Sequence, residues 1–134
     1  ERIRQYSWHC VGNDLVGPYA NLTDAYIAQE DLSNMNLTGA NLNGAILQGS
    51  NLSGINLTNS KLNLANLYSA NLSNANLKNA DLSYVKLTGV NLTGANLTGS
   101  TLNGADLNYV IWSNTTCPDG TNSDDNGDTC ENNL

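Results

Sequence analysis

The sequence predicts an all-β solenoid, in which short extended steps alternate with sharp corners around a shaft of leucine side chains. Three observations predict it. Leu or Ile occupies every fifth position from Leu22 to Leu107, which gives eighteen consecutive centres, and Trp112 extends the series. A small or apolar residue, most often Ala, stands two positions before most centres. The two residues after each centre are mostly Ser, Thr, Asn or Gly, which favour tight turns.

A period of five excludes the common regular structures. In a helix, successive centres would rotate by roughly 140° and scatter around the axis. In a flat strand, alternate centres would lie on opposite faces. An extended step of three residues followed by a corner places every centre and its small neighbour on the same side. The Asn or Asp between them then points outward, where its side chain can cap the turn or pair with another amide.

The number of sides per coil follows from charge pairing between coils. A four-sided coil repeats every 20 residues and places Lys61 beside Asp81 and Lys86 beside Asp106. A three-sided coil would instead place Lys61 near Asn76. We therefore expect a four-sided parallel β-helix of about four to five coils, with adjacent coils paired as parallel strands. One column of its core ladder is formed by Leu42, Leu62, Leu82 and Leu102.

Several pentads closely resemble a known repeat. Residues 40–44 (ANLNG), 70–74 (ANLSN) and 95–99 (ANLTG) are similar to the A(D/N)LXX motif of the pentapeptide-repeat family. The resemblance covers about two thirds of the chain and implies a right-handed quadrilateral β-helix. It implies little about function, because one fold serves many roles.

The chain divides into three parts. Residues 1–19 lie outside the repeat and carry enough apolar side chains to cover the first coil as an N-terminal cap; residues 20–112 form the solenoid, and residues 113–134 form a polar, acidic tail. Glu30 departs from the pattern, because it stands where a small inward residue belongs. We expect it to reach the open end of the first coil and meet Arg2 or Arg4, since a buried unpaired carboxylate is costly.

The tail is bracketed by Cys117 and Cys130. A disulfide between them would order a loop that has almost no core; the alternative is two free thiols in a reducing compartment. The CPDGT sequence at residues 117–121 resembles the tails of exported cyanobacterial pentapeptide-repeat proteins, which implies a periplasmic, thylakoid-lumenal or secreted location. Cys10 is either buried in the cap or bridged to another chain. We expect any signal peptide to lie outside the sequence.

Composition excludes several classes of function. The 134 residues suit one domain, and a net charge of -7 opposes binding to nucleic acid or an anionic membrane. No apolar stretch is long enough for membrane insertion. His9 is the only histidine, so we expect no catalytic residue, no cofactor and no enzyme activity. The one metal hypothesis is a weak calcium site in the tail, formed by Asn122, Asp124, Asn126 and Asp128.

The remaining hypotheses concern binding. Leu64, Tyr68 and Tyr84 point outward and form a possible interaction patch. The preferred interpretation is a structural scaffold or binding module for a protein or glycan; the alternative is a subunit of an extracellular filament, stacked end to end as a homo-oligomer. Some relatives imitate DNA and bind topoisomerases. That role is less favoured, because five acids and three lysines between Asp24 and Asp106 leave a charge of only -2.

Overall fold

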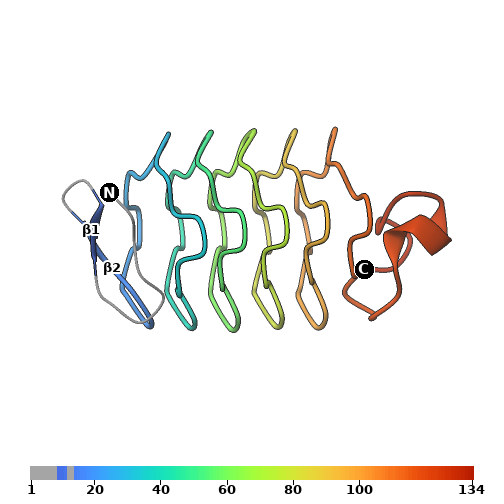
Figure 1. Cartoon of the computed structure of the whole chain (residues 1–134), viewed down its shortest axis with the longest axis horizontal. Helices are drawn as coiled ribbons and strands as arrows, with labels where there is room; N and C mark the ends of the chain where they lie inside the picture. Colours follow the sequence, from blue (N-terminus) through green and yellow to red (C-terminus); the bar gives the residue numbers. More distant parts are fainter. Residues whose placement is uncertain (1–8, 12–13) are drawn as a thin grey trace.

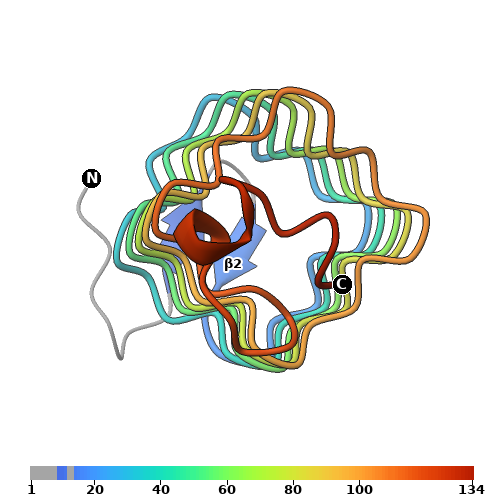
Figure 2. The same cartoon turned by 90° about the vertical axis from the view of Figure 1, so that its right-hand side faces the viewer.

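The protein is a rod of stacked coils, closed at each end by a different segment (Figure 1). The computed structural model describes residues 9–11 and 14–134. At one end, the antiparallel strands β1 (His9–Val11) and β2 (Asp14–Val16) pair as a hairpin. At the other end, the tail contains the short 3-10 helix η1 (Ser123–Asn126). Between them, the coils give the four-sided outline that Figure 2 shows from the end.

A ladder of parallel bridges joins each coil to the next. Sixteen bridges run from Asn21 to Thr116, and each joins residues 20 positions apart. The prediction that Lys61 lies beside Asp81 and Lys86 beside Asp106 is confirmed. The bridges are isolated and do not extend into longer strands, because each side of the coil holds only about three extended residues before the next corner. Each coil therefore pairs with the next through isolated bridges and not through strands of ordinary length.

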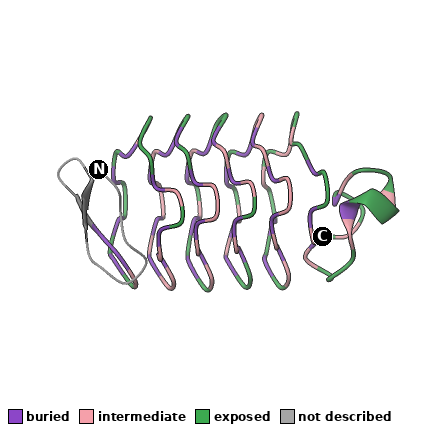
Figure 3. Ribbon diagram, in the orientation of Figure 1, coloured by how far each residue is buried: buried purple, intermediate pink, exposed green. Residues whose placement is uncertain are grey.

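The shaft of the rod is filled as the period of five predicts. Every Leu or Ile centre from Leu22 to Leu102 is buried, and the small residues two positions earlier are buried beside them (Figure 3). The predicted column Leu42, Leu62, Leu82 and Leu102 lies inside the shaft. Burying one such side chain stabilises the fold by about 1.5 to 3 kcal/mol. The repeated leucines therefore supply most of the apolar burial.

The corners have a left-handed backbone at the second residue after each centre. Gly94 adopts φ +70° there, which costs a glycine little. Leu64 (φ +63°) and Tyr84 (φ +58°) adopt the same conformation with large side chains, which is strained for an L residue. The outward Asn caps the turn, as expected: Asn71 Oδ1 accepts the backbone N–H of Ser73 at 3.0 Å. Side-chain caps therefore support several of the corners that lack glycine, such as those of Asn74 and Tyr84.

At the N-terminal end of the shaft, strand β2 lies beside the first coil (Figure 1). Val16 is fully buried at the first coil. Glu30 is exposed, and its backbone N–H donates to Ser50 Oγ at 3.2 Å. The Glu30 carboxylate is therefore not buried, which agrees with the expectation that burying it without a partner is costly. The proposed partners Arg2 and Arg4, and the side chains of His9 and Cys10, lie outside the described residues.

The C-terminal end continues beyond the boundary at residue 112 that the sequence suggested. The last parallel bridge joins Asn96 to Thr116. Cys117 stands five positions after Trp112 and is fully buried, so it occupies the next central position of the shaft. A cysteine at a leucine position is missed when the pattern is defined by Leu and Ile alone. The tail that follows lies across the end of the coil (Figure 2).

Candidate binding surface

The four sides of the coil differ in what they present to solvent. The bridge residues of each side form one wall: 21 to 101, 26 to 106, 31 to 111 and 36 to 116, in steps of 20. The last of these carries Asn at four positions and Thr at the fifth. We call the second wall, residues 26 to 106, the tyrosine wall, and we count the corner residues along both of its edges as part of it. Its bridge residues are Tyr26, Ile46, Asn66, Lys86 and Asp106.

The predicted patch belongs to the corners of the tyrosine wall. Leu64 and Tyr84 stand in one corner column, 68% and 62% exposed, and Tyr68 stands at the other corner, 48% exposed. Two further rings share this surface and were missed from the sequence: Tyr26 (72% exposed) and Tyr109 (87% exposed). Aligning the sequence in rows of 20 would have found them. The surface is therefore larger than the three-residue patch.

The ring of Tyr84 is held by a glycine in the next coil. A Cβ atom at Gly104 would lie 2.5 Å from Cδ1 and Cε1 of Tyr84. The ring therefore lies over the bare backbone of Gly104, in space that any other residue would fill. Tyr19 lies over Gly39 in the same way, outside the tyrosine wall. This packing fixes the orientation of both rings while leaving much of each side chain in solvent.

Hydrogen bonds fix the charged side chains on the walls. The pKa of Asp81 is lowered to about 2, mainly because the side chain of Ser83 donates to its carboxylate. The pKa of Asp106 is lowered by the backbone N–H of Asn108, then by Thr88, with a smaller effect of the nearby Lys86. Both carboxylates stay ionised at neutral pH. The tyrosine wall thus carries Asp24, Lys86 and Asp106, a net charge of 1 - 2 = -1.

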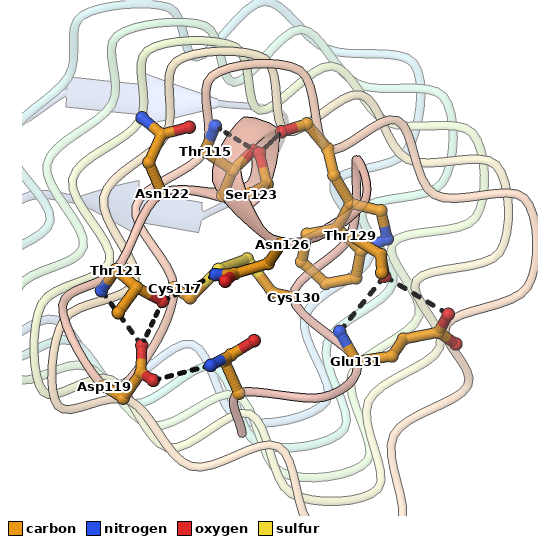
Figure 4. The surroundings of a disulfide bond; sticks show 12 residues. Thr115, Cys117, Asp119, Thr121, Asn122, Ser123, Asn126, Thr129, Cys130 and Glu131 are labelled. Atoms are coloured by element: carbon orange, nitrogen blue, oxygen red, sulfur yellow. Dashed lines mark hydrogen bonds between the residues drawn. A yellow bond between two sulfur atoms is a disulfide. The ribbon is translucent and has the colours of Figure 1, made fainter.

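The tail is attached to the shaft by a disulfide and a buried hydroxyl (Figure 4). Cys117 and Cys130 are bonded, and both are fully buried. Ser123 Oγ donates to the carbonyl of Trp112 and accepts the N–H of Thr115. These contacts cover one side of the last coil. Leu107 and Val110, on its other side, are only partly buried.

The side chains of three of the four calcium candidates, Asn122, Asp124 and Asn126, make other hydrogen bonds. Asn122 Oδ1 accepts the N–H of Asp124, Asp124 Oδ1 accepts the N–H of Asn114, and Asn126 donates to Thr121. Among the residues that the structure describes, no three His, Cys, Asp or Glu side chains gather as a metal site. Over the same residues, no helix is both long and apolar enough to span a membrane. The calcium site stays a prediction from the sequence.

Stacked 20-residue coils, inward leucines and outward amides together define a solenoid repeat protein with preformed flat walls. The family model of pentapeptide repeats matches residues 19–54, 50–89 and 75–111, with eight copies. The chain belongs to the pentapeptide-repeat family. No curated protein sequence matches it.

Solved structures agree with this assignment. HetL from the cyanobacterium Nostoc, involved in regulating heterocyst differentiation, is 35% identical over 76% of this chain and 53% of its own, with a TM-score of 0.66. A pentapeptide-repeat protein from the thylakoid lumen of Arabidopsis thaliana is 31% identical over 74% of this chain and 69% of its own, with a TM-score of 0.67. The fluoroquinolone-resistance protein QnrB1 is 24% identical over 65% of this chain and 42% of its own (TM-score 0.61), which shows the shared fold alone.

Proposed function

We propose that this protein is a non-enzymatic binding module or scaffold that works outside the reducing cytoplasm and presents its walls to a protein or glycan. The observation that carries the proposal is the 20-residue ladder, which holds outward side chains in fixed rows. For example, Lys61 N–H donates to Ala40 O at 3.0 Å, and Leu42 N–H donates to Lys61 O at 2.7 Å. A surface ordered in advance loses little conformational entropy when it binds.

The disulfide supports a location in the periplasm, thylakoid lumen or extracellular space. Such bonds persist mainly in oxidising compartments. Cys117 and Cys130 are both fully buried, so a reduced pair would leave two thiols inside the closed end. The lumenal Arabidopsis relative is consistent with an exported role. The match covers only 53% of the length of HetL, so the regulatory role of HetL is not assigned to this chain.

A second candidate function is self-association end to end. Among the described residues, the backbone N–H groups of Leu102 and Leu107 donate to no carbonyl, although the equivalent groups of earlier coils do. Leu107 and Val110 are partly exposed beside them. An unpaired edge with apolar neighbours favours pairing with another chain. Topoisomerase binding by DNA mimicry is not proposed, because three lysines interrupt the acidic residues of the walls.

Size-exclusion chromatography with light scattering, with and without reductant, tests the two candidates. A binding module elutes as a monodisperse monomer in both conditions. Hydrogen exchange of that monomer in a periplasmic or lumenal extract should then show added protection along one wall. A concentration-dependent polymer would contradict the proposal and favour the second candidate, and its absence in a Cys10→Ser variant would assign the contact to Cys10.

A further inference from the structure

Large apolar side chains are unevenly distributed over the coils. Seven are exposed between residues 16 and 116, and five of them lie on the tyrosine wall: Tyr26, Leu64, Tyr68, Tyr84 and Tyr109. The other two, Tyr19 and Ile111, lie apart from it. The bridge residues of the opposite wall, 36 to 116 in steps of 20, are only Asn and Thr, and Tyr19 stands at one of its bordering corners. Several exposed rings on one side of the rod indicate a contact surface.

The rings of this surface are prepared for contact. Tyr84 lies over Gly104, which fixes its orientation. The residue before it in the same corner column is Leu64, also exposed. A tyrosine ring supplies a large amphipathic face with few rotatable bonds, so little entropy is lost when a ligand covers it.

Polar groups stand between the rings. Asp106 accepts hydrogen bonds from Thr88 Oγ1 at 2.9 Å and Asn108 Nδ2 at 2.8 Å. Asn66 Oδ1 accepts the N–H of Tyr68 at 3.0 Å; among the described residues its amide NH₂ donates to no protein acceptor. Such a surface offers ring faces together with fixed amide and carboxylate groups. A sugar, with apolar C–H faces and hydroxyl edges, matches both kinds of group.

Charge and backbone pairing disfavour other extended polymers. A net charge of -1 on the wall and -7 on the chain repels nucleic acids and acidic polysaccharides. A peptide strand would need free backbone groups, but Ile46 N–H donates to Ala25 O at 2.8 Å and Lys86 N–H to Ala65 O at 2.9 Å. The wall therefore offers side chains and no strand edge.

The dimensions of the wall disfavour a second copy of the chain. With its two bordering corners the wall is about seven residues across and five coils along, a surface on the order of 20 Å by 20 Å. A stable protein interface needs about 800 Å² from each partner, about twice this area. A surface of this size instead fits a single chain of sugars.

From these observations we propose that the tyrosine wall binds a neutral, extended polysaccharide, with Tyr68 and Tyr84 as its principal stacking residues. The inference rests on the proposed binding function and names its ligand class. The chain would cross the wall, with its sugar faces on Tyr84 at one corner and on Tyr68 at the other. The hydroxyl groups would bond to Asn66 and the Asp106 cluster.

Affinity electrophoresis tests the proposal. The protein is run in native gels that contain hydroxyethylcellulose, mixed-linkage β-glucan, glucomannan or xylan, with polygalacturonate as the anionic comparison. At least one neutral polymer should retard the protein, and polygalacturonate should not. The Tyr68→Ala/Tyr84→Ala variant should bind roughly tenfold more weakly or not at all, as expected for removal of central aromatic contacts.

Tyr19→Ala is the matched control. Tyr19, like Tyr84, stands at a corner with positive φ and lies over a glycine of the next coil, but outside the tyrosine wall. It should leave binding unchanged, and urea midpoints of all variants verify that each is folded. Lack of retardation in all four neutral gels, full binding by the double variant, or equal loss in Tyr19→Ala would each overturn the proposal.

Analytical ultracentrifugation without glycan tests whether a second copy of the chain covers the tyrosine wall in place of a polysaccharide. Self-association that disappears in the Tyr68→Ala/Tyr84→Ala variant would make the wall an interface between copies and overturn the glycan assignment. A monomer that binds no glycan, yet gains exchange protection on a different wall in the extract, would overturn this inference alone. The proposed binding function would survive that result.

Discussion

Ser60 and Ser100 occupy the same side of the shaft two coils apart, yet only Ser60 is bonded. Ser60 Oγ donates to Leu57 O at 2.6 Å, whereas Ser100 Oγ is buried with no hydrogen-bond partner. An unpaired buried hydroxyl costs about 1 to 3 kcal/mol, more than a typical bond contributes. The same residue type therefore has opposite effects at two equivalent positions.

Alanine at each of these serines tests this difference. Ser60→Ala should lower the free energy of unfolding by about 1 kcal/mol, because the hydroxyl bond to the Leu57 carbonyl is lost, although that carbonyl still accepts the N–H of residue 60. Ser100→Ala should be neutral or stabilising by up to about 1 kcal/mol. Urea unfolding followed by circular dichroism measures both. Equal losses would show that Ser100 finds a partner in solution.

Leu62 and Leu64 are two residues apart and should respond in opposite directions. Leu62 is fully buried, so Leu62→Ala should cost about 2 to 5 kcal/mol. Leu64 is exposed with φ +63°, and Leu64→Asn should stabilise by about 1 kcal/mol, since Asn tolerates this conformation. Urea midpoints test both variants; destabilisation by Leu64→Asn would mean that its exposed side chain contributes packing.

Gly104→Ala separates ring packing from backbone strain when it is compared with Gly89→Ala. Both glycines have φ +70°, so each alanine introduces strain of about 1 to 2 kcal/mol. At Gly89 the new Cβ would meet only Ser69 Oγ at 3.4 Å, but at Gly104 it would displace the Tyr84 ring. Gly104→Ala should therefore be the more destabilising and should weaken any glycan binding. Identical urea midpoints would argue against ordered packing of the ring.

Asp81 should contribute to acid sensitivity. Its folded pKa of about 2 lies below the ordinary value of 3.8, so its contribution is present above about pH 4 and is lost as the pH falls towards 2. Partial exposure limits this to about 1 kcal/mol. Asp81→Asn retains the turn cap, as Asn71 shows, and should reduce the fall in urea midpoint between pH 5 and pH 2. An unchanged fall would assign the acid sensitivity to other carboxylates.

The disulfide should hold the tail more than the coils. Breaking Cys117–Cys130, which spans 13 residues, with a double Ser variant should cost about 3 kcal/mol. In a Trp8→Phe background, Trp112 is the only tryptophan and therefore the only source of tryptophan fluorescence. Loss of the disulfide should expose its buried side chain and shift its emission to longer wavelength. The far-UV spectrum should change little, since the ladder ends at Thr116. A blue emission maximum in the reduced protein would show that Ser123 and η1 suffice to hold the tail.

The core could be read from the sequence because its cause is local. An extended step of three residues sends a centre such as Leu82 and its neighbour Ala80 to one side, whatever the rest of the chain does. The corner residues and the outward Asn follow from the same step. The pairing of Lys61 with Asp81, 20 positions apart, could be recognised from the opposite charges of the two residues.

The surface depended on contacts that local pattern does not contain. Tyr26, Tyr68 and Tyr109 are far apart in sequence and share a wall only because the coil closes after four corners. The bare backbone of Gly104 became a support for Tyr84 through a neighbour 20 residues away, and Cys117 entered the shaft because the last coil continued past Trp112. The sequence by itself determined which side chains point inward, because that choice is made within each pentad. Only the tertiary structure decided which outward side chains meet, because that depends on how successive coils stack.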